Sequence, residues 1–115
     1  MLTVQEALRT AAAIVEATPI PDKRDSVKEL SDKRDGFFVR YEPNGGLDTV
    51  TLHVEMRFVQ NRTMCLKVQV SHGSQYRTPA EARKFIALLT LVTELGERIE
   101  EALSGQETFE FEVKS

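Results

Sequence analysis

Cysteine is nearly missing from this chain of 115 residues, and its scarcity excludes two kinds of site. Because Cys65 is the single cysteine, the chain can form neither an intrachain disulfide nor a zinc site built from several thiolates. A protein without disulfides is typical of a reducing compartment. The sequence therefore predicts a cytoplasmic protein.

Long apolar runs are missing as well. No apolar stretch approaches the roughly 20 residues that a transmembrane helix needs, so we expect no membrane partner. Residues 2–17 have an apolar centre, but Glu6, Arg9 and Glu16 interrupt it and no basic leader precedes it, unlike a secretion signal. We interpret this segment as a helix of the mature protein.

Neither sign of charge dominates the chain. Its net charge of -3 is too small to steer a partner, and its 41% hydrophobic and 29% charged residues are ordinary for a globular protein. We predict a single domain over residues 1–115. Within it, the charged motifs at residues 22–25 and 32–35 mark segment 18–35 as a connector. Two conformations fit the connector, which are a partly flexible chain and a chain with one or two helical turns around Val27 and Leu30.

Two capping boxes predict two helices. Thr3 precedes Glu6 at the start of an alanine-rich helix, and Thr78 precedes Glu81 at the start of a long helix that extends to Leu103. In a capping box, the threonine hydroxyl accepts from a free helix amide while the glutamate reaches back to the threonine amide. Gly96 lies within the long helix, where glycine is costly relative to alanine, and this indicates a close backbone approach there.

Alternating apolar residues between the helices predict three strands, at residues 37–41, 50–58 and 64–70. Opposed residues of an antiparallel pair point to the same face, so the apolar rows of the second and third strands fix their register. The predicted pairs are Phe58 with Met64, Met56 with Leu66, Val54 with Val68 and Glu55 with Lys67. The pairing of the first strand with the second fits a two-residue turn at Asn44-Gly45 or Gly45-Gly46.

A fourth strand is expected at residues 108–113, beside an edge of the sheet and parallel to the first and third strands, or paired with another chain. The predicted fold class is therefore α+β. It has an N-terminal helix, a three-stranded antiparallel meander, a long helix packed on one sheet face, and a C-terminal edge strand. The helix residues expected to face the sheet are Ala82, Phe85, Ile86, Leu89, Val92, Ile99 and Leu103.

The long helix carries a second apolar row, formed by Leu88, Leu91 and Leu95. Either the N-terminal helix covers this row, or a second copy or another protein does. Together with the exposed sheet edge, the row favours a small regulatory module that acts through protein association, as a homodimer. We expect no enzyme, cofactor or metal, because the two histidines lie in no recognisable metal or nucleophile motif. His53 and Cys65 are four residues out of register across the hairpin, too far apart for direct proton transfer.

Nucleic-acid binding is the alternative function. The outer sheet face is expected to hold cations and rings that could contact phosphates and bases, at Phe38, Arg40, His53, Arg57 and Lys67, although acidic side chains share this face. A third possibility is an anion site at the start of the long helix, with His72, Ser74 and Arg77.

Overall fold

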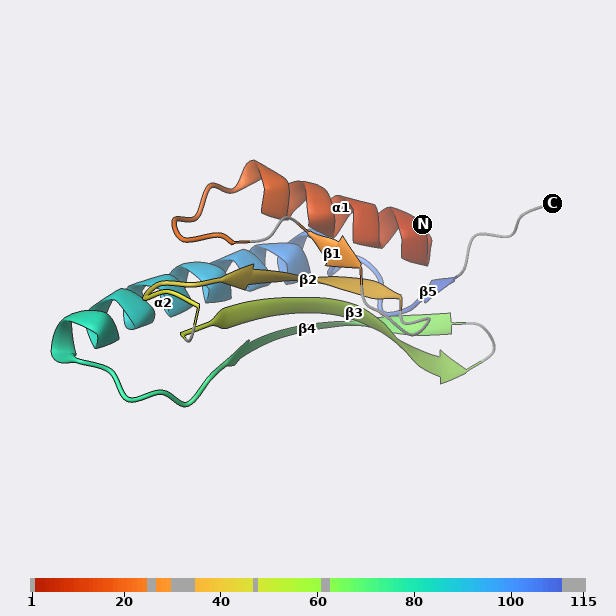
Figure 1. Cartoon of the computed structure of the whole chain (residues 1–115). Coiled ribbons are helices and arrows are strands. Elements are labelled where there is room, and N and C mark those ends of the chain that lie inside the picture. The colour runs from red at the N-terminus through yellow and green to blue at the C-terminus, as the bar shows by residue number, and fades with distance from the viewer. Residues whose placement is uncertain (1, 25–26, 30–34, 47, 61–62, 111–115) are drawn as a thin grey trace.

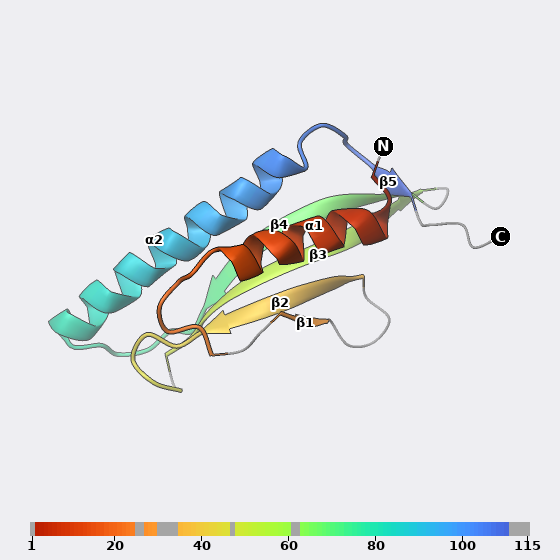
Figure 2. The same ribbon diagram turned by 90° about the horizontal axis from the view of Figure 1, so that it is seen from above.

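The computed structural model describes residues 2–24, 27–29, 35–46, 48–60 and 63–110. Two helices pack side by side on one face of an antiparallel sheet, and no described element covers the opposite face (Figure 1). Viewed from above, the long helix runs along one margin of the sheet, and a short strand forms the other margin (Figure 2). The α+β class and the position of the long helix on one sheet face agree with the sequence prediction.

Both helices begin as their sequences predict. Helix α1 spans Val4–Ala17 with Thr3 as its N-cap, and helix α2 spans Pro79–Ala102 with Thr78 as its N-cap. Each threonine accepts from the glutamate amide three residues later, and each glutamate side chain accepts from the threonine amide. The chain leaves α1 at Thr18, just before Pro19, because proline disfavours a helical residue in front of it.

The sheet has five strands in the order β1-β2-β3-β4-β5, and every neighbouring pair is antiparallel. The strands span Lys28–Glu29, Gly36–Tyr41, Val50–Gln60, Thr63–His72 and Phe109–Glu110. The predicted meander is β2-β3-β4, and the predicted β3–β4 register is confirmed, including Glu55 opposite Lys67. Residues 61–62, which connect β3 to β4, lie outside the described residues.

Strand β1 was not predicted. The sequence left room for helical turns between the charged motifs, but Lys28 and Glu29 are extended and pair with Phe38 and Phe37. Leu30 lies outside the described residues. The edge of β2 offers unpaired backbone groups, and pairing with it stabilises an extended conformation that the local sequence does not specify.

The tight turn predicted between β2 and β3 is wrong, although the parity of the pairing is right. The ladder stops at Tyr41 opposite Val50, so residues 42–49 form a longer connection. Gly45, at φ 90°, takes the left-handed conformation within it. The side chain of Asn44 donates to Glu81 O in the first turn of α2, and Asp48 accepts from Arg77 just before that helix; these tertiary bonds hold the connection open.

The parallel direction expected for the C-terminal strand is also wrong. Strand β5 lies beside β4, but Phe109 pairs with Met64 and Glu110 with Thr63, so the two strands are antiparallel. After α2, the chain continues in the direction of that helix as it passes the start of β4, and this direction is opposite to that of β4. Gln106 fixes this path, since its side-chain amide donates to Leu2 O at 2.8 Å and accepts from Leu2 N at 2.9 Å.

The core lies between the helices and the inner sheet face. Helix α1 packs over β2 and β3, while α2 packs over β3 and β4. A Cβ on Gly96 would lie 3.2 Å from Val68 Cγ1, so the close approach predicted at this glycine is present. The inner row of β3 is buried from Val50 to Met56, but Phe58 continues beyond the helices and is 70% exposed.

Candidate partner-binding edge

Strand β4 has a long margin with no neighbour among the described residues. Within the described residues, strand β5 pairs with Thr63 and Met64, at the start of β4. From Cys65 to His72, no strand in the described part of the chain pairs with the side of β4 that faces away from β3. We name residues 65–72 the open edge.

Two hydrogen bonds show which backbone groups of the open edge face outward. Gly73 N donates to Thr49 O at 3.4 Å, so odd-numbered residues at this end of the ladder point their amides toward β3. On the other side of β3, Met56 N donates to Asp35 O at 2.8 Å, so even-numbered residues of β3 point toward β2. Both bonds indicate the same alternation in the direction of the backbone amides and carbonyls along the two strands. The amides and carbonyls that face away from β3 therefore belong to Leu66, Val68, Val70 and His72.

The same stretch also has incompletely covered apolar side chains. The central strand β3 buries Val50, Leu52 and Val54 completely. Their neighbours in β4, which are Leu66, Val68 and Val70, lie on the same inner face but are only partly buried. The open edge therefore combines outward backbone groups with a partly covered apolar row.

Helix α2 extends this apolar row above the edge. At about 100° per residue, Ile86 lies about 80° around the helix from the sheet-facing Gly96, and Leu91 lies about 140° in the opposite sense. Leu91 lines a cavity with Pro19 and Ile20, which identifies its flank as the one toward the α1 end. Ile86 is on the other flank and is 60% exposed, and its neighbour Phe85 packs against His72 at the end of β4.

The predicted interface row of α2 is divided by the fold. Leu88 and Leu95 are only 3% and 1% exposed, because they pack into the core of the single chain. Leu91 alone remains accessible, at 40%. An association that uses Leu88 or Leu95 would require this packing to open, so the accessible apolar surface of α2 consists of Leu91 on one flank and Ile86 on the other.

The five residues predicted for a nucleic-acid face do share the outer side of the sheet. Their charges are largely matched there. Arg57 forms an ion pair with Glu55 at 2.8 Å, Arg40 lies 3.6 Å from Glu42, and Lys67 is directly opposite Glu55. The rings of Phe38 and His53 lie 6.4 Å apart at a tilt of 33°. The face therefore has mixed charge, and the structure does not make it a basic surface.

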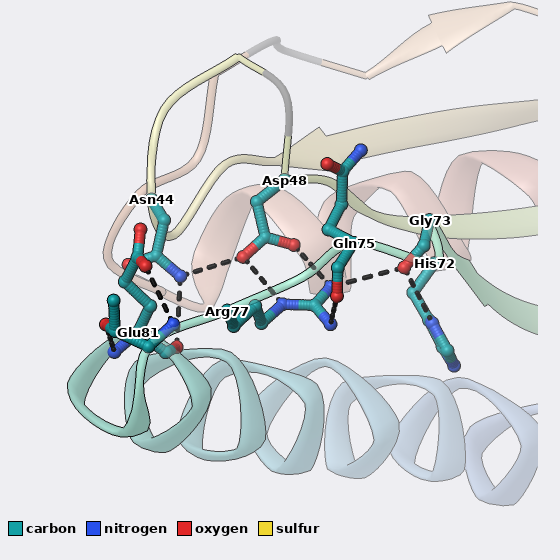
Figure 3. Close-up of polar contacts among 8 residues, drawn as sticks. Asn44, Asp48, His72, Gly73, Gln75, Arg77 and Glu81 are labelled. Atoms are coloured by element: carbon teal, nitrogen blue, oxygen red, sulfur yellow. Dashed lines mark hydrogen bonds and ion pairs between the residues drawn. The ribbon is translucent and has the colours of Figure 1, made fainter.

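Arg77, one of the three residues predicted for an anion site, belongs to a structural cluster instead (Figure 3). Arg77 Nε donates to Asp48 Oδ2 at 3.0 Å, and Arg77 Nη2 also donates to Asp48 and to the carbonyl of Gly73. The guanidinium lies 3.7 Å above the Phe85 ring. Hydrogen bonding from Arg77 holds the pKa of Asp48 below its usual value. Arg77 is thus neutralised by a buried carboxylate and ties the end of β4 to the start of α2.

His72 and Ser74 are not part of this ion pair. The ring of His72 packs edge-on against Phe85, with centroids 5.2 Å apart, and Ser74 is exposed in the connection to α2. The capping box occupies the Thr78 and Glu81 amides. Anion binding at this position remains a prediction.

One polar pair was not predicted from the sequence. His53 Nε2 lies 3.0 Å from Ser71 Oγ, diagonally across the β3–β4 ladder. The confirmed register could have indicated it, because Ser71 is two residues beyond Gln69, the direct neighbour of His53. A nucleophilic serine needs its histidine oriented by a third group. Within the described residues, His53 has no hydrogen bond to a carboxylate, and the pair lies on the exposed outer face.

The described residues contain no cluster of three or more histidine, cysteine or acidic side chains placed to hold a metal ion. Neither described helix is both long and apolar enough to cross a bilayer. Comparison of the chain with protein families, with curated proteins and with solved structures gives no match.

Proposed function

We propose that this chain is a small, non-enzymatic regulatory module that acts through protein association, as a homodimer in the cytoplasm. The open edge carries this proposal. It offers a partner the outward backbone groups of four residues, together with the partly covered side chains of Leu66, Val68 and Val70. A strand added there would satisfy the backbone groups and cover the apolar row at once.

The open edge has few of the features that prevent unwanted pairing. Sheet edges in monomeric proteins are usually blunted by proline, charge, bulges or short strands. The open edge is eight residues long, contains no proline, and has Lys67 as its one Lys, Arg, Asp or Glu residue. The irregularity in the β3–β4 ladder lies between Phe58 and Gln60, beside the start of β4 and outside the open edge. An edge of this kind supports a role in association.

The two exposed apolar residues of α2 allow a matched test. We expect Ile86→Lys to weaken self-association by about tenfold, or about 1.4 kcal/mol, because Ile86 flanks the open edge. Leu91→Lys makes the same chemical change on the other flank and should leave the dissociation constant unchanged. Light scattering over a range of protein concentrations measures both, and circular dichroism checks that each variant folds. A monomeric parent protein at every concentration would refute the homodimer.

Nucleic-acid binding is the second candidate, supported by the placement of Arg40, Arg57 and Lys67 on one face with Phe38 and His53. Phosphate contacts make binding fall steeply as salt rises. The experiment is a filter assay with single-stranded and duplex DNA and RNA at low salt. Retention that disappears in Arg57→Gln and at higher salt would favour this function; absence of retention at low salt would remove it.

A further inference from the structure

We propose that the open edge pairs with the open edge of a second copy, antiparallel and about a two-fold axis that passes beside Gln69. The two sheets then become one continuous sheet with all four helices of the two copies on the same side. This inference rests on the proposed homodimer and adds its surface and its register. It follows from the direction of the backbone groups, the parity of the strand and the position of β5.

Parity restricts the possible registers. A two-fold axis perpendicular to the sheet places both inner faces on the same side, so even-numbered residues of one copy must oppose even-numbered residues of the other. The outward backbone groups also belong to the even-numbered residues, so the same registers form the hydrogen-bonded pairs. The face and the backbone therefore require the same condition, which is that opposed residue numbers add up to an even value.

The ends of the open edge select one of these registers. Strand β5 occupies the position beside Met64, and β4 itself ends at His72. The segment left for pairing between outward-facing residues thus runs from Leu66 to His72. When two such segments overlap completely, Leu66 of one copy opposes His72 of the other, Val68 opposes Val70, and Gln69 lies opposite Gln69 across the axis.

The other registers are less favourable for identifiable reasons. A two-residue shift of the second copy toward β5 places its His72 opposite Met64, where Phe109 already lies. A shift of four residues in this direction also sets Lys67 against Lys67, a like-charge pair. A shift the other way leaves Leu66 without a strand partner. In the proposed register, Lys67 instead lies opposite the uncharged Ser71.

The proposed pairing completes the apolar layer. The partly buried Val68 of each copy meets Val70 of the other on the inner face. On the opposite face, the two polar outer faces become one surface that crosses the axis at the Gln69 pair.

Disulfide trapping tests the register. Gln69 is an odd-numbered residue, so its pair across the axis is of the non-hydrogen-bonded kind, with Cα atoms about 4.5 Å apart, within the range of a disulfide. In a Cys65→Ser background, Gln69→Cys should form a covalent dimer under mild oxidation that a thiol reductant reverses. Each chain then has one cysteine, so no link can form within a chain.

Ser71→Cys in the same background is the matched control. Residue 71 shares the strand and the face, but the proposed axis places its two copies about four residues apart along the strands, too far for a disulfide. We expect at least tenfold slower cross-linking than for Gln69→Cys. Equal or faster cross-linking at residue 71 would overturn the proposed register.

Light scattering on the Cys65→Ser protein separates failure of this inference from failure of the proposed function. A dimer in which Gln69→Cys fails to cross-link would overturn edge pairing while leaving the homodimer intact. A monomer at all concentrations, with no cross-linking at either position, would overturn both. A dimer that is trapped at residue 69 and not at residue 71 supports both.

Discussion

The two margins of the sheet are built differently. The β2 margin is covered by β1 and by the preceding chain, since Arg24 N donates to Arg40 O at 3.0 Å and Glu42 N donates to Asp22 O at 2.9 Å. The covering residues Lys23, Arg24, Lys28 and Glu29 are charged, which opposes further pairing. The β4 margin has a short β5 at one end and the open edge along the rest. One margin is thus closed by charged chain, and the other is available for association.

The largest expected difference comes from placing a charge at each margin. We expect Val70→Lys to weaken self-association by about 100-fold, because each dimer would then have two lysines beside the apolar seam. Val27→Lys changes a partly buried valine near the covered margin in the same way and should leave the dissociation constant within about twofold. Light scattering gives both constants. Equal weakening by the two variants would contradict the assignment of association to the β4 margin.

The Asp48 cluster holds the end of the open edge, because Arg77 joins Asp48 to the carbonyl of Gly73. Asp48→Asn should lower the free energy of unfolding by about 2 kcal/mol, as expected when a charged partner of a buried hydrogen bond is lost. Urea denaturation measures the change. Asp22→Asn is the control at an exposed position and should change stability by less than about 0.5 kcal/mol.

The same cluster predicts a pH dependence. Arg77 lowers the pKa of Asp48, so the folded protein binds a proton at this carboxylate less readily than the unfolded chain does. The resulting stability is present above the unfolded pKa of about 4 and is lost as the pH falls through the lower folded pKa. The stability difference between the parent protein and Asp48→Asn should therefore shrink below about pH 4. A difference that stays constant down to pH 2 would contradict the role of this ion pair.

The smallest expected effect concerns Ser71, which the proposed register places opposite Lys67 of the second copy. Ser71→Glu should tighten the dimer and Ser71→Lys should weaken it, each by about 2- to 30-fold for two cross-strand contacts of about 0.2–1 kcal/mol. Both shifts should decrease at high salt. Shifts of the same sign in both variants, measured by light scattering, would count against the register.

The sequence predicted those parts of the fold that local chemistry determines. Threonine and glutamate three residues apart predicted both helix starts, and the alternating apolar rows predicted the β3–β4 register. A register has only a few discrete choices once the buried face is known, so composition along two strands is enough to select it. The close approach at Gly96 was predictable for a similar reason, since glycine is costly in a helix without a packing role.

Tertiary contacts decide what the sequence left open or predicted wrongly. The tight turn predicted at Asn44-Gly45 or Gly45-Gly46 gave way to a longer connection, because Asn44 bonds to Glu81 of α2 and Asp48 bonds to Arg77, which precedes that helix. The direction of β5 depends on Gln106 binding to Leu2 at the other end of the chain. Leu88 and Leu95 form a row on the helix surface, but only the packing around α2 shows that both are buried.

The open edge itself was only partly predictable. A meander must have two margins, and the sequence anticipated an exposed edge and a strand beside it. It did not indicate that β1 would close one margin, nor that β5 would cover only the first two residues of β4. Both strands are two residues long, and such short pairings carry almost no periodic signal.

Amide hydrogen exchange along β4, measured by NMR at protein concentrations above and below the dimer dissociation constant, tests the central claim most directly. Exchange reports whether each backbone amide is hydrogen-bonded. We predict that the outward amides of Leu66, Val68 and Val70 are protected at high concentration and exchange quickly on dilution, while the amides that face β3 stay protected throughout. Rapid exchange of the outward amides at every concentration would contradict pairing at this edge.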